Sequence, residues 1–155
     1  MTTSGIVGGL PYNANNCLIF SNGSSYSYSS GSTLTFSNIE LIGPEPACSL
    51  NTSTGIFTCN LAGCYIIHIT PYLQGVPNNV GFTGNVYVNG SLYHTCATLN
   101  GSLAFTNSFM NIILCTMIVG NPGDTFYFTI DNTAGSAHNI QSGASGGWGD
   151  VLFFA

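Results

Sequence analysis

The stretch that decides the fold is Gly55-Ile56-Phe57-Thr58-Cys59-Asn60-Leu61-Ala62-Gly63-Cys64-Tyr65-Ile66-Ile67. Residues 55–59 and 63–70 both read as β-strands, because β-branched and aromatic residues dominate them. A short segment ending at Gly63 separates the two runs. Residues that favour helices are scarce here and elsewhere in the chain. This part of the sequence therefore predicts β structure.

Similar runs lie on both sides of this stretch, with turn residues between them. Asn89-Gly90 tolerates the positive φ angles of a type I′ hairpin turn, and Asn100-Gly101 and residues 121–124 predict further turns. Strands are predicted at 17–20, 34–39, 82–88, 91–98, 108–119, 125–130 and 149–154. About ten short strands with regular turns are typical of an all-β, two-sheet antiparallel sandwich or jelly roll.

The composition narrows the possible functions. The chain has 155 residues, which suits one domain, and 3% of them are charged, with no Lys or Arg. An average globular protein has roughly 25% charged residues. Without cations the chain is not expected to bind nucleic acid or an anionic membrane surface. A surface without charge presents Asn, Ser, Thr and Gly to water, or is covered in an assembly.

Membrane insertion is not expected. The longest apolar stretch, residues 109–119, is interrupted by Asn111 and Thr116. It is shorter than the roughly 20 residues that a transmembrane helix needs. Residues 1–5 do not resemble a secretory signal, so we expect either a signal already removed or another route to the destination.

The six cysteines predict an oxidising location with disulfides, because their number is even and the chain is polar and poor in charge. Buried free thiols are the alternative for each of them.

Two features predict that the chain packs against copies of itself. The strand around residues 111–115 is apolar on both faces, so a neighbouring subunit is the simplest cover for its outer face. The Gly-rich extension at residues 1–16 precedes the predicted domain at 17–155. Ile6, Val7 and Leu10 in this extension are predicted to lie on a neighbouring subunit, as an added strand.

The pattern Gly-x-Phe-Thr-Cys-x-x-x-Gly-x-Tyr at residues 55–65 resembles the signature of complement one-q globular heads, which share their fold with tumour necrosis factor. Residues 88–90, 123–127 and 148–153 resemble later motifs of that family, in the same order, over residues 17–155. The resemblance is that of a distant relative. It implies a ten-strand jelly roll that forms homotrimers through aromatic and aliphatic faces. The interface residues that it suggests are Tyr65, Ile67, Phe126, Phe128 and Phe153.

No chemistry beyond binding is expected. His68, His94 and His138 lie on separate predicted strands or loops, and the five acidic residues are scattered, so no metal site or cofactor is predicted. The chain has no Gly-x-Ser-x-Gly motif and no cation to hold an anionic transition state. It is therefore not expected to be an enzyme, and no catalytic residue is predicted.

Two functions fit these observations. The first is a structural, self-assembling subunit of an extracellular filament, a spore-surface layer or a viral fibre or decoration. The alternative is a knob that binds a receptor or glycan. Its contacts would come from Tyr26 and Tyr28, in the Ser-rich loop predicted at residues 21–32. Both functions place the protein outside the cell, on a spore surface or on a virion surface.

Overall fold

The computed structural model describes residues 4–7, 10–13, 17–42, 46–76, 80–99, 108–135, 137–141 and 147–154. All of the regular secondary structure in these residues consists of β-strands. Among them no helix is long and apolar enough to cross a membrane. The strands are β1 (Ser4–Val7), β2 (Leu10–Asn13), β3 (Leu18–Ser21), β4 (Tyr26–Tyr28), β5 (Asn38–Ile42), β6 (Cys48–Asn51), β7 (Ile56–Cys59), β8 (Gly63–Thr70), β9 (Tyr72–Val76), β10 (Phe82–Val88), β11 (Ser91–Leu99), β12 (Ser108–Asn111), β13 (Leu114–Gly120), β14 (Thr125–Asn132), β15 (His138–Ile140) and β16 (Trp148–Phe154).

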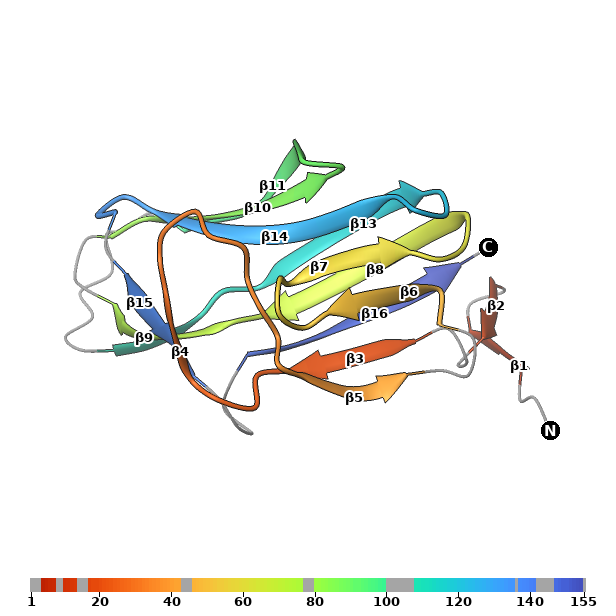
Figure 1. The fold of residues 1–155 in the computed structure, drawn as a ribbon, viewed down its shortest axis with the longest axis horizontal. Coiled ribbons are helices and arrows are strands. Elements are labelled where there is room, and N and C mark those ends of the chain that lie inside the picture. Colours follow the sequence, from red (N-terminus) through yellow and green to blue (C-terminus); the bar gives the residue numbers. More distant parts are fainter. Residues whose placement is uncertain are drawn as a thin grey trace.

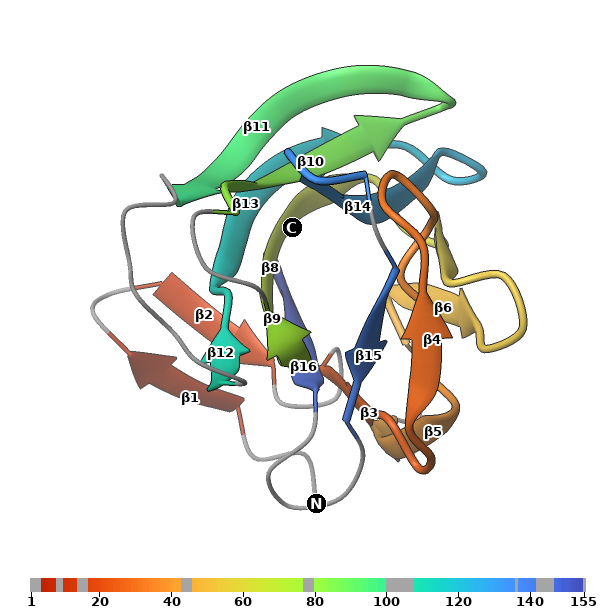
Figure 2. The ribbon, with the colours of Figure 1, turned by 90° about the vertical axis from the view of Figure 1, so that its left-hand side faces the viewer.

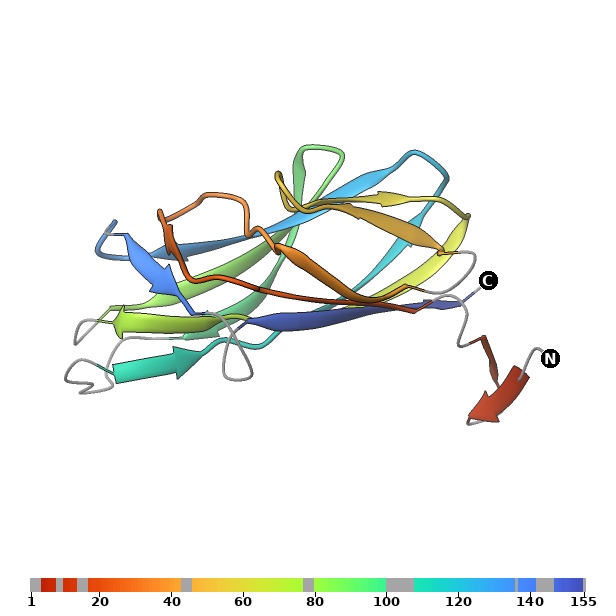
Figure 3. The same cartoon turned by 60° about the horizontal axis from the view of Figure 1, so that its bottom comes forward.

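Two five-stranded antiparallel sheets form the body of the molecule (Figures 1 and 2). The first sheet has the order β11-β10-β14-β7-β6, and the second sheet has the order β13-β8-β16-β3-β5. A four-stranded sheet, β12-β9-β15-β4, lies at one end of the sandwich. The hairpin of β1 and β2 projects beyond the other end, where β2 contacts β16 (Figure 3). Strands distant in sequence alternate within each sheet, as in a jelly roll.

The core between the two sheets is rich in aromatic rings. Phe57 stacks on Phe126 with ring centres 4.8 Å apart, and Phe20 lies edge-on to Phe36 at 4.6 Å. Each such pair contributes about 0.5–1.5 kcal/mol beyond the area that it buries. The Phe of the quoted motif is thus at the centre of the core, which explains why this stretch indicates the fold.

The turn predicted at Asn89-Gly90 is confirmed, since φ is 50° at Asn89 and 79° at Gly90. The Asn89 amide also joins this turn to the next one, because its Nδ2 donates to Asp124 Oδ1 at 2.9 Å and its Oδ1 accepts from the Thr125 amide at 2.8 Å. Hydrogen bonds from the backbone of Asn121 and from Asn89 lower the pKa of Asp124.

Some predicted strand boundaries are wrong. Residues 34–37 belong to no strand, although Leu34 donates a backbone hydrogen bond to Phe128, and β5 begins at Asn38. The strand predicted at 108–119 is broken at Ile112 and Ile113, where the Ile112 amide bonds to Pro71. The short strands β4, β6, β9 and β15 were not predicted, because three to five residues carry too little periodicity. The predicted Asn100-Gly101 turn lies outside the described residues.

Candidate functional site

The outer side of β13 is apolar and uncovered. Alternate residues of this strand face the core, and those between them are exposed. Ile113, just before the strand, is 61% exposed, Met117 is 58% exposed and Val119 is 75% exposed. Cys115, between them, is also exposed. Four successive outward positions therefore carry no charge.

The register of the second sheet extends this surface across two more strands. Met117 lies opposite Ile66 on β8, which lies opposite Leu152 on β16. In the next row Val119, Cys64 and Phe154 are aligned in the same way. All of the β8 and β16 members are half-buried. We call this surface the apolar face, and it consists of Cys64, Ile66, Ile113, Cys115, Met117, Val119, Leu152 and Phe154.

One polar pair lies beside the apolar face. His68 Nδ1 is 3.5 Å from Asp150 Oδ1, which is the one ion pair found in the described residues when His68 is protonated. The Trp148 ring lies edge-on to the His68 ring at 5.2 Å, and Cys115 is opposite His68 in the sheet register.

Exposed apolar residues continue onto β11, the edge strand of the first sheet. Leu92 and Tyr93 are both more than half exposed. The edges of the two sheets meet here, because Thr116 Oγ1 on β13 is 3.3 Å from His94 Nε2 on β11 (Figure 2). Exposed apolar residues therefore lie on both strands, β11 and β13, that meet at this edge of the sandwich.

The interface residues suggested by the family resemblance lie elsewhere. Tyr65, Ile67, Phe126, Phe128 and Phe153 are all 5% exposed or less and belong to the core of the single chain. Strand alternation turns their side chains inward in the single chain, and their contact with a neighbouring subunit stays a prediction. Their neighbours in sequence on β8 and β16, such as Ile66 and Leu152, point outward instead.

The three predicted interface residues of the extension lie in the β1–β2 hairpin. Ile6 is paired with Pro11, and Val7 is paired with Leu10. That this hairpin lies on a neighbouring subunit stays a prediction.

The two predicted ligand-binding tyrosines have different environments, and the segment 21–32 contains β4 rather than being a loop throughout. Tyr28 is 2% exposed, and its hydroxyl donates to the Ile130 carbonyl at 3.0 Å and accepts from the Ile130 amide at 2.7 Å. Burial raises its pKa. This side chain ties β4 to the core, and its contact with a ligand stays a prediction.

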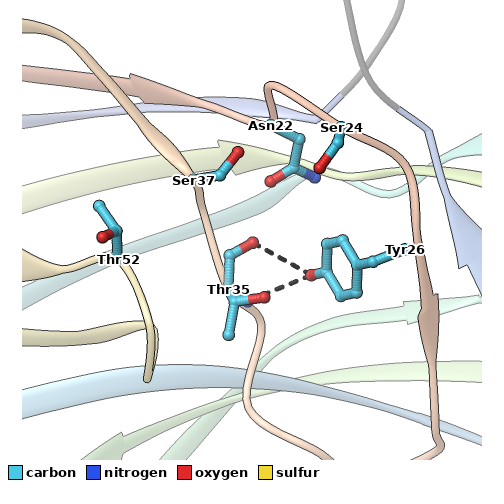
Figure 4. Close-up of a pocket in the computed structure, with 6 residues that line it drawn as sticks. All are labelled: Asn22, Ser24, Tyr26, Thr35, Ser37 and Thr52. Carbon is cyan, nitrogen blue, oxygen red and sulfur yellow. Dashed lines mark hydrogen bonds between the residues drawn. The ribbon is translucent and has the colours of Figure 1, made fainter.

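Tyr26, in contrast, borders a polar pocket of about 140 Å³ (Figure 4). Its hydroxyl is held by the carbonyl and amide of Thr35, both at 3.1 Å. Asn22 is 3% exposed, yet neither its Nδ2 nor its Oδ1 has a hydrogen-bond partner in the described residues. Leaving such a group unpaired costs about 1–3 kcal/mol. The lining residues are Asn22, Ser24, Tyr26, Thr35, Ser37 and Thr52.

The cysteines are six free thiols, so the predicted disulfides are not present. Cys48 and Cys59 lie opposite each other on β6 and β7, and both are buried. Burial, with the nearby thiols of Cys59 and Cys17, raises the pKa of Cys48 to about 12. These residues act as small apolar side chains.

No group of three or more metal-binding side chains comes together in the part of the chain that the structure describes. The three histidines lie on different strands: His68 on β8, His94 on β11 and His138 on β15. Burial lowers the pKa of His138, which packs against Phe82.

The two sheets, their strand order and the aromatic core define a jelly roll of the tumour necrosis factor and complement one-q type, as the sequence motifs predicted. An Eiger tumour necrosis factor from S. frugiperda has a similar structure, with a TM-score of 0.65 and 14% identity over 90% of this chain and 92% of that one. The globular domain of zebrafish complement 1qA protein is also similar, with a TM-score of 0.57 and 10% identity over 90% of this chain and 95% of that one.

At these identities the likeness concerns the fold alone. No protein-family model matches the sequence, and no curated protein matches it.

Proposed function

We propose that this protein is a self-assembling structural subunit that forms homotrimers through the apolar face and β11. In this proposal it works outside the cell, in a filament, a spore-surface layer or a viral fibre or decoration, and it is not an enzyme. The similar structures are an Eiger tumour necrosis factor and a complement 1qA globular domain, and neither is named as an enzyme.

The observation that carries the proposal is the uncovered apolar face on a sheet whose other side is already buried. Single exposed apolar residues are common, but a contiguous patch marks an interaction surface. Ile113, Met117 and Val119 lie in one line along β13, and two further strands extend that line into a surface. A second copy of the chain is a suitable cover, because the other copy brings an equally uncharged surface.

The charge composition supports the same proposal. The whole chain has five acidic residues and no Lys or Arg, so little charge opposes the approach of two copies. The pair of His68 and Asp150 lies beside the apolar face and gives it one directional contact. Such a polar pair within an apolar interface can fix the register of the subunits.

The β1–β2 hairpin is proposed to complete the assembly. It projects beyond the end of the sandwich, where a neighbouring subunit can accept it (Figure 3). Assembly should therefore weaken in a chain that lacks residues 1–16. Equal assembly with and without these residues would show that the hairpin takes no part in the contact between subunits.

The central test changes Met117 to Asp and measures the mass in solution by analytical ultracentrifugation. A carboxylate buried without a partner is costly, so Met117→Asp should be a folded monomer of about 16.2 kDa while the unchanged chain has three times that mass. Ser49→Asp is the matched control, since Ser49 is exposed on β6, at the far edge of the first sheet. A monomeric unchanged chain, or a trimeric Met117→Asp variant, would contradict the proposal.

The alternative, a receptor- or glycan-binding knob, is favoured by a different observation, the polar pocket beside Tyr26. Binding at this pocket is compatible with assembly, because the two surfaces lie at opposite edges of the sandwich.

A further inference from the structure

We propose that the pocket between β3, β4, the segment 33–37 and the β6–β7 turn binds a neutral, polyhydroxylated ligand, such as one unit of a glycan. The inference goes beyond self-assembly and does not depend on it. It starts from the Asn22 side chain, which is buried at the pocket with a donor and an acceptor unpaired.

The position of Asn22 shows what the ligand has to supply. Figure 4 shows its amide pointing into the space bordered by Thr35, Ser37 and Tyr26. Its own backbone is already fixed, because the Asn22 amide nitrogen donates to the Gly147 carbonyl at 3.0 Å. The side chain needs one acceptor and one donor close together. Two neighbouring sugar hydroxyls meet this need, since each hydroxyl both donates and accepts.

The rest of the lining fits the same ligand. Five of the six lining residues carry a hydroxyl. Ser37 Oγ accepts from the Gly23 amide at 2.7 Å, so its proton is available to a ligand oxygen. The hydroxyls of Ser24 and Thr52 make no hydrogen bond within the described residues. The pocket thus offers hydroxyls from three chain segments around one amide.

Tyr26 supplies the apolar part of the site. Both of its hydroxyl hydrogen bonds are made with the Thr35 backbone, so its ring rather than its hydroxyl is available. A ring held in this way loses little conformational entropy when a ligand packs against it. The C–H groups of a sugar ring are suited to such a surface.

Charged ligands fit the pocket poorly. None of its lining residues is acidic or basic, and the whole chain has no Lys or Arg. An anion would lose its hydration without gaining a counter-charge. A calcium ion would find no carboxylate. The volume of about 140 Å³ admits a small ligand or a terminal sugar unit rather than a long chain.

The pocket stays open in the proposed assembly. It lies beside β3, β4 and the end of β6, whereas the apolar face lies over β13, β8 and β16 and continues onto β11. In the strand order β6 and β5 are the edges opposite β11 and β13 (Figure 2). An assembled particle would therefore present one pocket per subunit on its outer side.

The test is a titration of the full chain with methyl glycosides of galactose, mannose, fucose and N-acetylglucosamine. Binding is measured by isothermal titration calorimetry and by NMR. At least one of them should bind with a dissociation constant of about 1 mM or lower, and glucuronate and phosphate should not bind. Thr52→Val should weaken this binding about three- to tenfold through one lost hydrogen bond. Thr58→Val, an equivalent change on β7 outside the pocket, should leave it unchanged.

Asn22→Leu separates a ligand-binding role from a structural one. Removing an unpaired amide should leave the melting temperature equal or higher, while sugar binding falls more than about tenfold. A lower melting temperature together with unchanged binding would assign Asn22 to the fold and overturn the proposal. The proposal also fails if no neutral sugar binds, if Thr52→Val has no effect, or if a crystal soaked with the sugars shows only ordered water at Asn22. The monomeric Met117→Asp variant should bind as well as the unchanged chain.

Discussion

Gly55 occupies a position in the fold where any larger residue would be strained. Its φ is 71°, and a Cβ built on it would lie 1.8 Å from the Leu34 carbonyl oxygen, which is backbone and cannot move away alone. Gly90 has a similar φ of 79° but has nothing within 4 Å of the same position. Gly90→Ala should therefore cost about 1–2 kcal/mol through the left-handed backbone alone. Gly55→Ala should cost clearly more, because the clash adds to that strain.

Urea unfolding of the two variants measures this difference. Equal losses of unfolding free energy would show that Leu34 relaxes away from position 55 without cost. The comparison needs no other control, because both changes add one methyl group at a positive φ.

At this scale local chemistry was predictable from the sequence and distant partners were not. Asn89-Gly90 adopts the expected turn, since the two residues themselves determine the backbone angles. Tyr28 was assigned to a ligand surface because a Ser-rich segment surrounds it. Besides the nearby Ser32 carbonyl, its hydroxyl contacts the backbone of Ile130, which is 102 residues away, and no local pattern reveals such a distant contact. The polar pocket was missed for the same reason, since its lining comes from three separate segments.

At the scale of elements, β8 and β13 show why the sequence alone does not separate the buried side chains of a strand from the exposed ones. Both faces of these strands carry apolar residues, so alternation in the sequence does not tell the inner face from the outer one. The family motif directed attention to Tyr65 and Ile67, which are both buried in the core of the single chain. That a neighbouring subunit covers the apolar strand stays a prediction, and the residues that need such a cover are Ile113, just before β13, and Met117 on β13.

The reactivity of the Cys115 thiol shows whether a neighbouring subunit covers the outer side of β13. It is exposed in the single chain, on the outer side of β13 between Ile113 and Met117. In the monomeric Met117→Asp variant one thiol should react rapidly with a maleimide, and in the unchanged chain this reaction should be at least about tenfold slower. The buried Cys48, whose pKa is raised to about 12, should stay unreactive until the protein unfolds.

Mass spectrometry of the labelled peptide identifies the reacting thiol. Adding Cys115→Ser to Met117→Asp should abolish the rapid phase. Rapid labelling of Cys115 in the unchanged chain, at a concentration where it is assembled, would exclude β13 from the interface.

At the scale of the whole molecule, the fold and the charge composition lead to one physical picture. A jelly roll places half of its strand residues in the core and half on the surface, and here the surface half is nearly uncharged. Charged residues on the surface normally prevent copies of a protein from associating. Where the acidic residues are few, the apolar face is free to associate, and the polar pocket at the opposite edge is the part that stays in contact with solvent.

The same picture predicts how assembly responds to salt. Attraction between opposite charges is screened by salt, with a Debye length of about 10 Å at 0.1 M. The chain has a net charge of −5, so its copies repel rather than attract each other electrostatically, and apolar burial drives association. Raising NaCl from about 50 mM to about 500 mM should therefore leave the dissociation constant unchanged or tighten it slightly. Sedimentation equilibrium at pH 8 measures it, with Met117→Asp as the monomer standard. A trimer that dissociates in high salt would require ion pairs between subunits and would contradict this prediction, because the one ion pair in the described residues, between His68 and Asp150, lies within a single chain.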